Sequence, residues 1–168
     1  MVGIDSELPK FAGIPESPHL PGNQLTQLPA ELGKLTNLSS LDLGLNKLTK
    51  LPDQIGQLAS LKNFDLSGNV LNSLPESIGK LSSLKQLNLG QNQLTTLPES
   101  LGQLTNLRSL HLPENPLQQL PESLGKLTNL SDLTATFKNL PTDALAKIRT
   151  SLSTTLVSPL QIRGLTGL

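Results

Sequence analysis

Apolar residues recur along this chain in a fixed order, and the order repeats every 23 residues. Each unit reads LxxLxLxxNxLxxLPxxLGxL, with Leu, Ile or one Phe at the apolar positions of the central units. In the LxL part, apolar and polar positions alternate, which predicts a short strand with one buried face.

The LPESIG segment at residues 74–79 predicts where each short helical turn begins and ends. Pro75 stands where a first helical turn tolerates a missing N–H, and Glu76 follows near the positive end of the helix dipole. Gly79 stands where a left-handed residue would end the turn. Because one unit of strand, bend and turn cannot bury its own leucines, the units must stack, with parallel strands and right-handed crossovers.

This repeat resembles that of the leucine-rich repeat family, and the resemblance covers about residues 20 to 140, roughly five units. The 23-residue LPxxLGxL form is similar to the intracellular class, which includes Ras-binding scaffold proteins, plant Ras-group proteins and many bacterial repeat proteins. The resemblance implies an α/β fold, a right-handed solenoid with short parallel strands on the concave face and short helical turns on the convex face. It also implies a non-catalytic module for protein–protein interaction.

We predict three parts of the chain. Residues 1–18 form an irregular N-terminal segment or a partial cap, residues 19–140 form the repeat array, and residues 141–168 form a C-terminal cap. The pattern degrades after Leu130, where Ala135 takes a Leu position and Lys138 takes the Asn position. A predicted helix with Leu145 and Ile148 on one face would cover the last leucine layer, and the remaining tail is predicted to be loose.

One asparagine per unit has a structural interpretation. Where the strand ends and the chain bends inward, backbone groups lose their ladder partners, and a buried Asn carries donors and acceptors that can satisfy them. We therefore interpret this column as part of the fold and not as a site. Its members lie 23 residues apart: Asn23, Asn46, Asn69, Asn92 and Asn115.

Charge and composition narrow the function. Thirteen Lys and Arg balance thirteen Asp and Glu, which argues against nucleic-acid or anionic-membrane binding as the main activity. The lack of Cys removes disulfides, thiolate catalysis and Cys-based zinc sites, and it fits a reducing compartment. We recognise no signal peptide and no membrane-spanning segment, so we predict a cytoplasmic monomer without membrane insertion.

The search for catalytic chemistry points away from an enzyme. His19 and His111 share one column of the predicted sheet, but four strand spacings, roughly 19 Å, separate them, so they cannot share a metal ion. No serine lies in GxSxG, and no glycine-rich phosphate loop is present. Asp42 and Asp65 form a carboxylate pair on neighbouring strands, which we interpret as solvated surface acids because the sheet is open. We predict no catalytic residue, metal site or cofactor.

Side chains that point out of the concave sheet are the candidates for partner binding. One such column contains Ser40, Asn63, Gln86, Ser109 and Asp132, and the next contains Asp42, Asp65, Asn88, His111 and Thr134. Pro113 removes a backbone donor, so we expect it to weaken the strand ladder there. With Glu114, Leu45 and Phe137, it marks where the concave surface differs most from its neighbours. The candidate residues on this face are Asp42, Asp65, Asn88, His111 and Glu114.

A basic column precedes the strands and consists of Lys62, Lys85 and Arg108, with Ser39 and Ser131 at its ends. An acidic column on the helical side consists of Asp53, Glu76, Glu99 and Glu122. The helix dipole is a sufficient cause for the acidic column. The basic column has no equivalent cause, so it either makes the surface soluble or steers an acidic protein partner.

Three hypotheses on function follow. The first is a non-catalytic protein-interaction module that binds on the concave face or its rim. The second is a secreted or surface array of bacterial type for adhesion to host proteins or glycans, which a flanking signal or anchor would favour. The third is the substrate-recognition part of a larger signalling protein or effector whose enzymatic site lies elsewhere.

Overall fold

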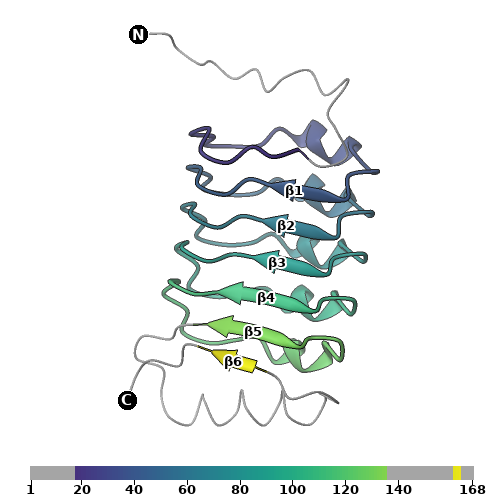
Figure 1. The fold of residues 1–168 in the computed structure, drawn as a ribbon, viewed down its shortest axis with the longest axis vertical. Coiled ribbons are helices and arrows are strands. Elements are labelled where there is room, and N and C mark those ends of the chain that lie inside the picture. The colour runs from purple at the N-terminus through teal and green to yellow at the C-terminus, as the bar shows by residue number, and fades with distance from the viewer. Residues whose placement is uncertain (1–17, 136–160, 164–168) are drawn as a thin grey trace.

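The computed structural model describes residues 18–135 and 161–163. Within these residues, one parallel sheet contains six strands in the order of the sequence (Figure 1). The strands are β1 (Ser40–Asp42), β2 (Asn63–Asp65), β3 (Gln86–Asn88), β4 (Ser109–Leu112), β5 (Asp132–Ala135) and β6 (Gln161–Arg163). Five short 3₁₀ helices alternate with them: η1 (Ala30–Lys34), η2 (Asp53–Gln57), η3 (Glu76–Lys80), η4 (Glu99–Gln103) and η5 (Glu122–Lys126).

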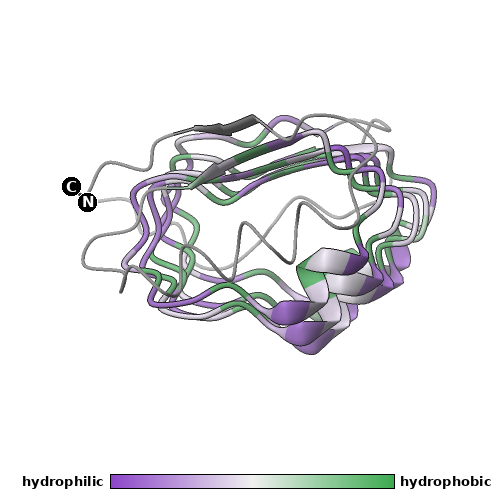
Figure 2. Ribbon diagram, turned by 90° about the horizontal axis from the view of Figure 1, so that it is seen from below, coloured by the Kyte–Doolittle hydropathy of each residue, from purple (hydrophilic) through white to green (hydrophobic). Residues whose placement is uncertain are grey.

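The strands stack with the register that the 23-residue period predicts. Leu41 pairs with Phe64, Phe64 with Leu87, and Leu87 with Leu110. Viewed from below, the strands lie on one side of the coil and the helices on the opposite side (Figure 2). The predicted α/β solenoid, with its strands on the concave face and its helical turns on the convex face, is confirmed.

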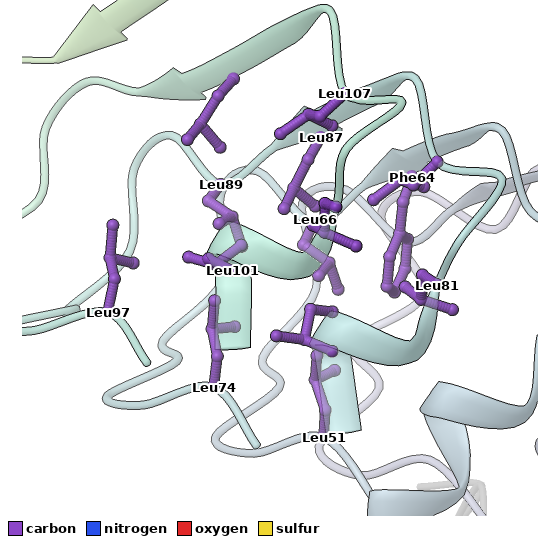
Figure 3. Close-up of a cluster of buried hydrophobic side chains, with 14 of the residues drawn as sticks. Leu51, Phe64, Leu66, Leu74, Leu81, Leu87, Leu89, Leu97, Leu101 and Leu107 are labelled. Carbon is purple, nitrogen blue, oxygen red and sulfur yellow. The ribbon is translucent and has the colours of Figure 1, made fainter. Parts of the chain in front are cut away.

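The core lies between the sheet and the helices. Phe64 and Leu87 of the strands, and Leu81 and Leu101 of the helical side, are at most 2% exposed. Figure 3 shows these side chains gathered in one cluster. Each fully buried Leu stabilises the fold by about 1.5–3 kcal/mol through the hydrophobic effect. Because every unit supplies leucines from both sides, neighbouring units bury each other's apolar surface.

The glycine of each helix has a different role from the one that we predicted. Gly79 lies inside η3 rather than at a left-handed end, and the described glycines with positive φ are Gly22 and Gly68. The reason for glycine is close stacking. A Cβ built on Gly56 would lie 2.5 Å from the carbonyl oxygen of Ser77 in the next helix, and Gly79 meets the Ser100 carbonyl in the same way. The missing side chain thus sets the spacing of the convex face.

The asparagine column has the predicted structural role from Asn46 to Asn115. Nδ2 of Asn69 donates to the carbonyls of Leu43 and Leu66, at 3.0 Å each, and Oδ1 accepts from the N–H of Leu48 at 2.9 Å. Equivalent bonds hold Asn46, Asn92 and Asn115, and all four side chains are buried. Asn23 differs, because it is exposed and donates to the carbonyl of Pro21.

The C-terminal segment contains a strand that the sequence analysis missed. Gln161–Arg163 form β6, which pairs in parallel with β5, so that Leu133 lies opposite Ile162. The prediction of a loose tail was therefore wrong for these three residues. Residues 1–17, Phe137, Lys138 and the predicted helix with Leu145 and Ile148 lie outside the described residues, and the three domain boundaries stay predictions.

Candidate interaction surface

The basic column lies on the rim of the sheet, and its backbone is part of the ladder. The N–H of Lys85 donates to the carbonyl of Lys62, and the N–H of Arg108 donates to the carbonyl of Lys85, both at 2.8 Å. All three side chains are exposed. The ion pairs found in the described part of the chain involve His19 and His111, so none of its carboxylates neutralises the basic column.

The acidic column on the convex side lies where the helices begin. Each acid is in the first turn of a helix, at the positive end of that helix's dipole. Glu99 has a further contact, because the N–H of Ser123 in the next helix donates to its Oε2 at 3.1 Å. The pKa of Glu99 is lowered, most of all by the side chain of Ser123. Burial has the second largest influence and raises this pKa, while the backbone N–H groups of Ser123 and Glu122 and the charge of Lys126 lower it further.

Asp42, Asp65 and Asn88 form one column on the concave face and close the bend after each strand. Oδ1 of Asp42 accepts from the N–H of Gly44 at 2.9 Å, and Oδ1 of Asp65 accepts from the N–H of Ser67 at 2.8 Å. Asn88 repeats the arrangement with the N–H of Gly90 at 3.2 Å. These residues therefore have a structural role that the sequence analysis missed. Its signal was an Asp or Asn two residues before a Gly or Ser.

Two histidines replace the Asp or Asn of this column, and each is followed by a proline. The sequence reads His-Leu-Pro at residues 19–21 and again at 111–113. In both places His stands where the other units have the Asp or Asn that closes the bend. Pro, which has no N–H, stands where the other units have the residue whose N–H donates to that Asp or Asn. His111 instead contacts its neighbours, since Nε2 lies 2.8 Å from Oγ of Ser109 and Nδ1 lies 3.3 Å from Oγ1 of Thr134.

Pro113 does not weaken the ladder, so that prediction was wrong. Its carbonyl accepts from the N–H of Gln91 at 2.8 Å, and β4 extends over four residues, one more than β3. The physical reason is that the N–H in this column donates to a side chain of its own strand in the preceding units. A proline removes a donor that the neighbouring strand does not use.

The carboxylates of Asp42 and Asp65 are already engaged on both oxygens. Oδ2 of Asp42 lies 2.6 Å from Nδ1 of His19, and Oδ2 of Asp65 accepts from Nδ2 of Asn88 at 3.0 Å. With Oδ1 of each acid bonded to the backbone, the pair offers no oxygen without a hydrogen-bond partner. The arrangement fits a rigid polar surface better than an acid–base pair, which needs an oxygen directed at a substrate.

His111, Ser109 and Asp132 come together, although the sequence analysis placed no His–Asp pair beside a serine. Oδ2 of Asp132 lies 3.8 Å from Nε2 of His111, the same ring nitrogen that contacts Ser109. In a catalytic triad the acid bonds the other ring nitrogen and orients it. This geometry therefore lacks the triad arrangement. The described residues also contain no group of three His, Cys, Asp or Glu placed to hold a metal ion.

A column of left-handed residues precedes the asparagines: Gly22, Leu45, Gly68, Gln91 and Glu114. Leu45 has a φ of 52°. Among the large apolar side chains of the described residues, it is the exposed one, at 65%. Nε2 of Gln91 donates to Oε2 of Glu114 at 3.2 Å, and Glu114 is exposed at the far end of this column.

Comparison with known proteins identifies the family. The family model described as a leucine-rich repeat region matches residues 53–154, and a second leucine-rich repeat model matches residues 19–71. The chain therefore belongs to the leucine-rich repeat family, whose members are typically non-enzymatic modules for protein–protein interaction. A search of curated proteins gives no match.

Two solved structures show the same fold. A leucine-rich repeat protein of Leptospira interrogans is 32% identical, with a TM-score of 0.71 over 84% of this chain. An internalin of Listeria monocytogenes is 28% identical, with a TM-score of 0.60 over 84% of this chain. The chain spans 40% and 39% of the lengths of these two proteins. In the described residues, no helix is long and apolar enough to span a membrane.

Proposed function

We propose that this chain is a non-catalytic protein-interaction module that binds its partner on the concave sheet face and along the basic column. The observation that carries the proposal is the basic column itself, three exposed cations in register that form no ion pair with a carboxylate of the described part. Like charges on neighbouring strands repel each other, so the column opposes folding slightly. A partner with acidic side chains would turn this repulsion into attraction.

The concave face supports the same function because its polar groups are held rigidly. The backbone ladder fixes the strands, and hydrogen bonds hold the side chains of Asp42, Asp65 and Asn88. Side chains that are held in place before binding lose less conformational entropy when a partner docks. The cytoplasmic location and the monomeric state remain predictions.

Affinity capture from a lysate of the source organism, read by mass spectrometry, tests the proposal. The concave variant carries Asn63→Glu and Gln86→Glu, which change two exposed positions of one strand column. The matched control carries Gln57→Glu and Gln103→Glu on the exposed ends of η2 and η4. We expect a protein that the wild type and the control capture and that the concave variant loses. Equal capture by all three proteins would contradict binding on the concave face.

A further inference from the structure

We infer that the basic column of Lys62, Lys85 and Arg108 receives an acidic stripe on one α-helix of a partner protein, with that helix running along the solenoid axis. The inference rests on the proposed interaction function and names the kind of partner. Three properties of the column support it: its fixed length, its charge surroundings and its spacing.

The column has a fixed length because the backbone beneath it is rigid. The carbonyl of Lys62 accepts from the N–H groups of Lys85 and Gln86, at 2.8 and 3.0 Å, and the carbonyl of Lys85 is bonded in the same way to the next unit. Neighbouring strands lie about 4.8 Å apart, so the three cations span about 10 Å. Ser39 and Ser131 occupy the next positions on either side, which limits the charged stretch to three units.

The surroundings of the column favour separate carboxylates over a continuous polyanion. Asp132 lies in the repeat unit after that of Arg108, the last cation, and its N–H donates to the carbonyl of Arg108 at 3.0 Å. Asp42 and Asp65 lie further along the strands on the same concave face. A nucleic acid carries a charge on every phosphate and would meet these acids as well as the cations. A protein segment can place its carboxylates over the basic column alone.

The spacing of the column fits a helix better than an extended strand. In an α-helix, residues i, i+4 and i+7 lie on one face and span about 10.5 Å, at 1.5 Å per residue. On one face of an extended strand, residues i, i+2 and i+4 span about 13 Å. The helix matches the roughly 10 Å of the column, and the strand exceeds it by about 3 Å. Two helical turns are therefore enough to place one carboxylate on each cation.

Designed peptides test this inference by fluorescence anisotropy with the full 168-residue chain. The first peptide is an alanine-rich helix labelled with a fluorophore and carrying Glu at i, i+4 and i+7. The second has the same composition with Glu at i, i+2 and i+5, which spreads the acids around the helix. The third is a strand-forming peptide with Glu at alternate positions. Since exposed ion pairs change affinity severalfold each, we expect the striped helix to bind about tenfold more tightly than either of the others.

Matched variants of the protein separate the rim from general charge effects. Lys62→Glu, Lys85→Glu and Arg108→Glu together should abolish the preference for the striped helix. The control triple variant, with Lys34→Glu, Lys80→Glu and Lys126→Glu, changes the formal charge equally at the exposed ends of η1, η3 and η5. It should keep the preference. Binding of the striped helix should also weaken as the salt concentration rises.

Three results would overturn the inference. These are equal affinity for the three peptides, a preference that survives charge reversal of the basic column, and tighter binding of a single-stranded oligonucleotide than of the striped helix. If the peptides show no preference while the concave variant still loses its captured protein, this inference fails and the proposed function stands. Urea unfolding of both triple variants confirms that any loss comes from the surface and not from misfolding.

Discussion

The basic and acidic columns look alike in the sequence and differ in the structure. Both repeat one kind of charge at the same position in successive units, and both are exposed. The acids lie in the first turn of each helix, at the positive end of its dipole, and Glu99 accepts a hydrogen bond from the N–H of Ser123. The cations have no such partner in the described part of the chain. A repeated charge therefore indicates a binding partner only when no interaction with the protein's own backbone explains why that charge is repeated.

The asparagine column has more hydrogen bonds to the backbone than either charged column. Removing one of these asparagines should therefore give the largest loss of stability. Asn92→Ala would leave the N–H of Leu71 and the carbonyls of Leu66 and Leu89 without their side-chain partner. We expect a loss of about 3 kcal/mol in the free energy of unfolding, the upper end for buried unsatisfied groups. Urea denaturation measures it. Asn72→Ala, at an exposed position, is the control and should change little.

The convex stacking provides the next largest effect. Gly79→Ala places a Cβ against the carbonyl and Cβ of Ser100, so the two helices must move apart. Overpacking of this kind costs about 2 kcal/mol. Thermal unfolding followed by circular dichroism measures the shift. A neutral substitution would show that another feature sets the helix spacing.

Leu45 provides a test with the opposite sign. A leucine in the left-handed region costs about 1–2 kcal/mol, and asparagine tolerates that region better. Since Leu45 is largely exposed, Leu45→Asn should raise the free energy of unfolding by about 1 kcal/mol. The same urea experiment applies. A loss of stability would mean that the side chain makes apolar contacts that outweigh the backbone strain.

Neutralising one charge from each column gives the smallest effects and compares the columns directly. The lowered pKa of Glu99 means that its charge stabilises the fold above the usual pKa of glutamate, about 4.3, and that this stabilisation is lost as the pH falls through the lowered value. Glu99→Gln should therefore be less stable than wild type at neutral pH and approach it as the pH falls below the lowered pKa of Glu99. Lys85→Gln should unfold at the wild-type denaturant concentration or slightly above it at neutral pH, since it relieves the repulsion within the basic column. A matching loss in Lys85→Gln would reveal a structural partner for the basic column.

The sequence predicted the columns correctly because a fixed repeat length determines which residues become neighbours. Ser40, Asn63 and Gln86 lie side by side for this reason, as do Asp42, Asp65 and Asn88. Contacts between columns could not be predicted in the same way. The approach of Asp132 to His111 depends on side-chain rotamers, and the need for glycine at position 79 depends on the distance between helices. Neither quantity is contained in the apolar pattern.

The C-terminal strand β6 is a second feature that the 23-residue period could not predict. Ile162 pairs with Leu133 across a connection longer than one repeat, so the 23-residue spacing gave no signal for it. The partner-binding roles of Lys62, Lys85, Arg108 and Glu114 stay predictions, since they depend on a partner's surface as well as on this one.

At the strand ends, His and Pro replace the Asp or Asn and its N–H donor together, at residues 19–21 and 111–113. This has a consequence for the design of repeat arrays. The bend after each strand has two compatible pairs of residues. One is an Asp or Asn with an N–H donor two residues later, and the other is a His with a Pro two residues later. A designer who wants a further histidine on this face should therefore combine Asp65→His with Ser67→Pro, because position 67 is flanked by Gly44 and Gly90, whereas position 90 packs against the ring of Pro113. Either change alone would leave one half of the pair without its counterpart. The smallest interchangeable part of this face is thus a matched pair of residues rather than a single position.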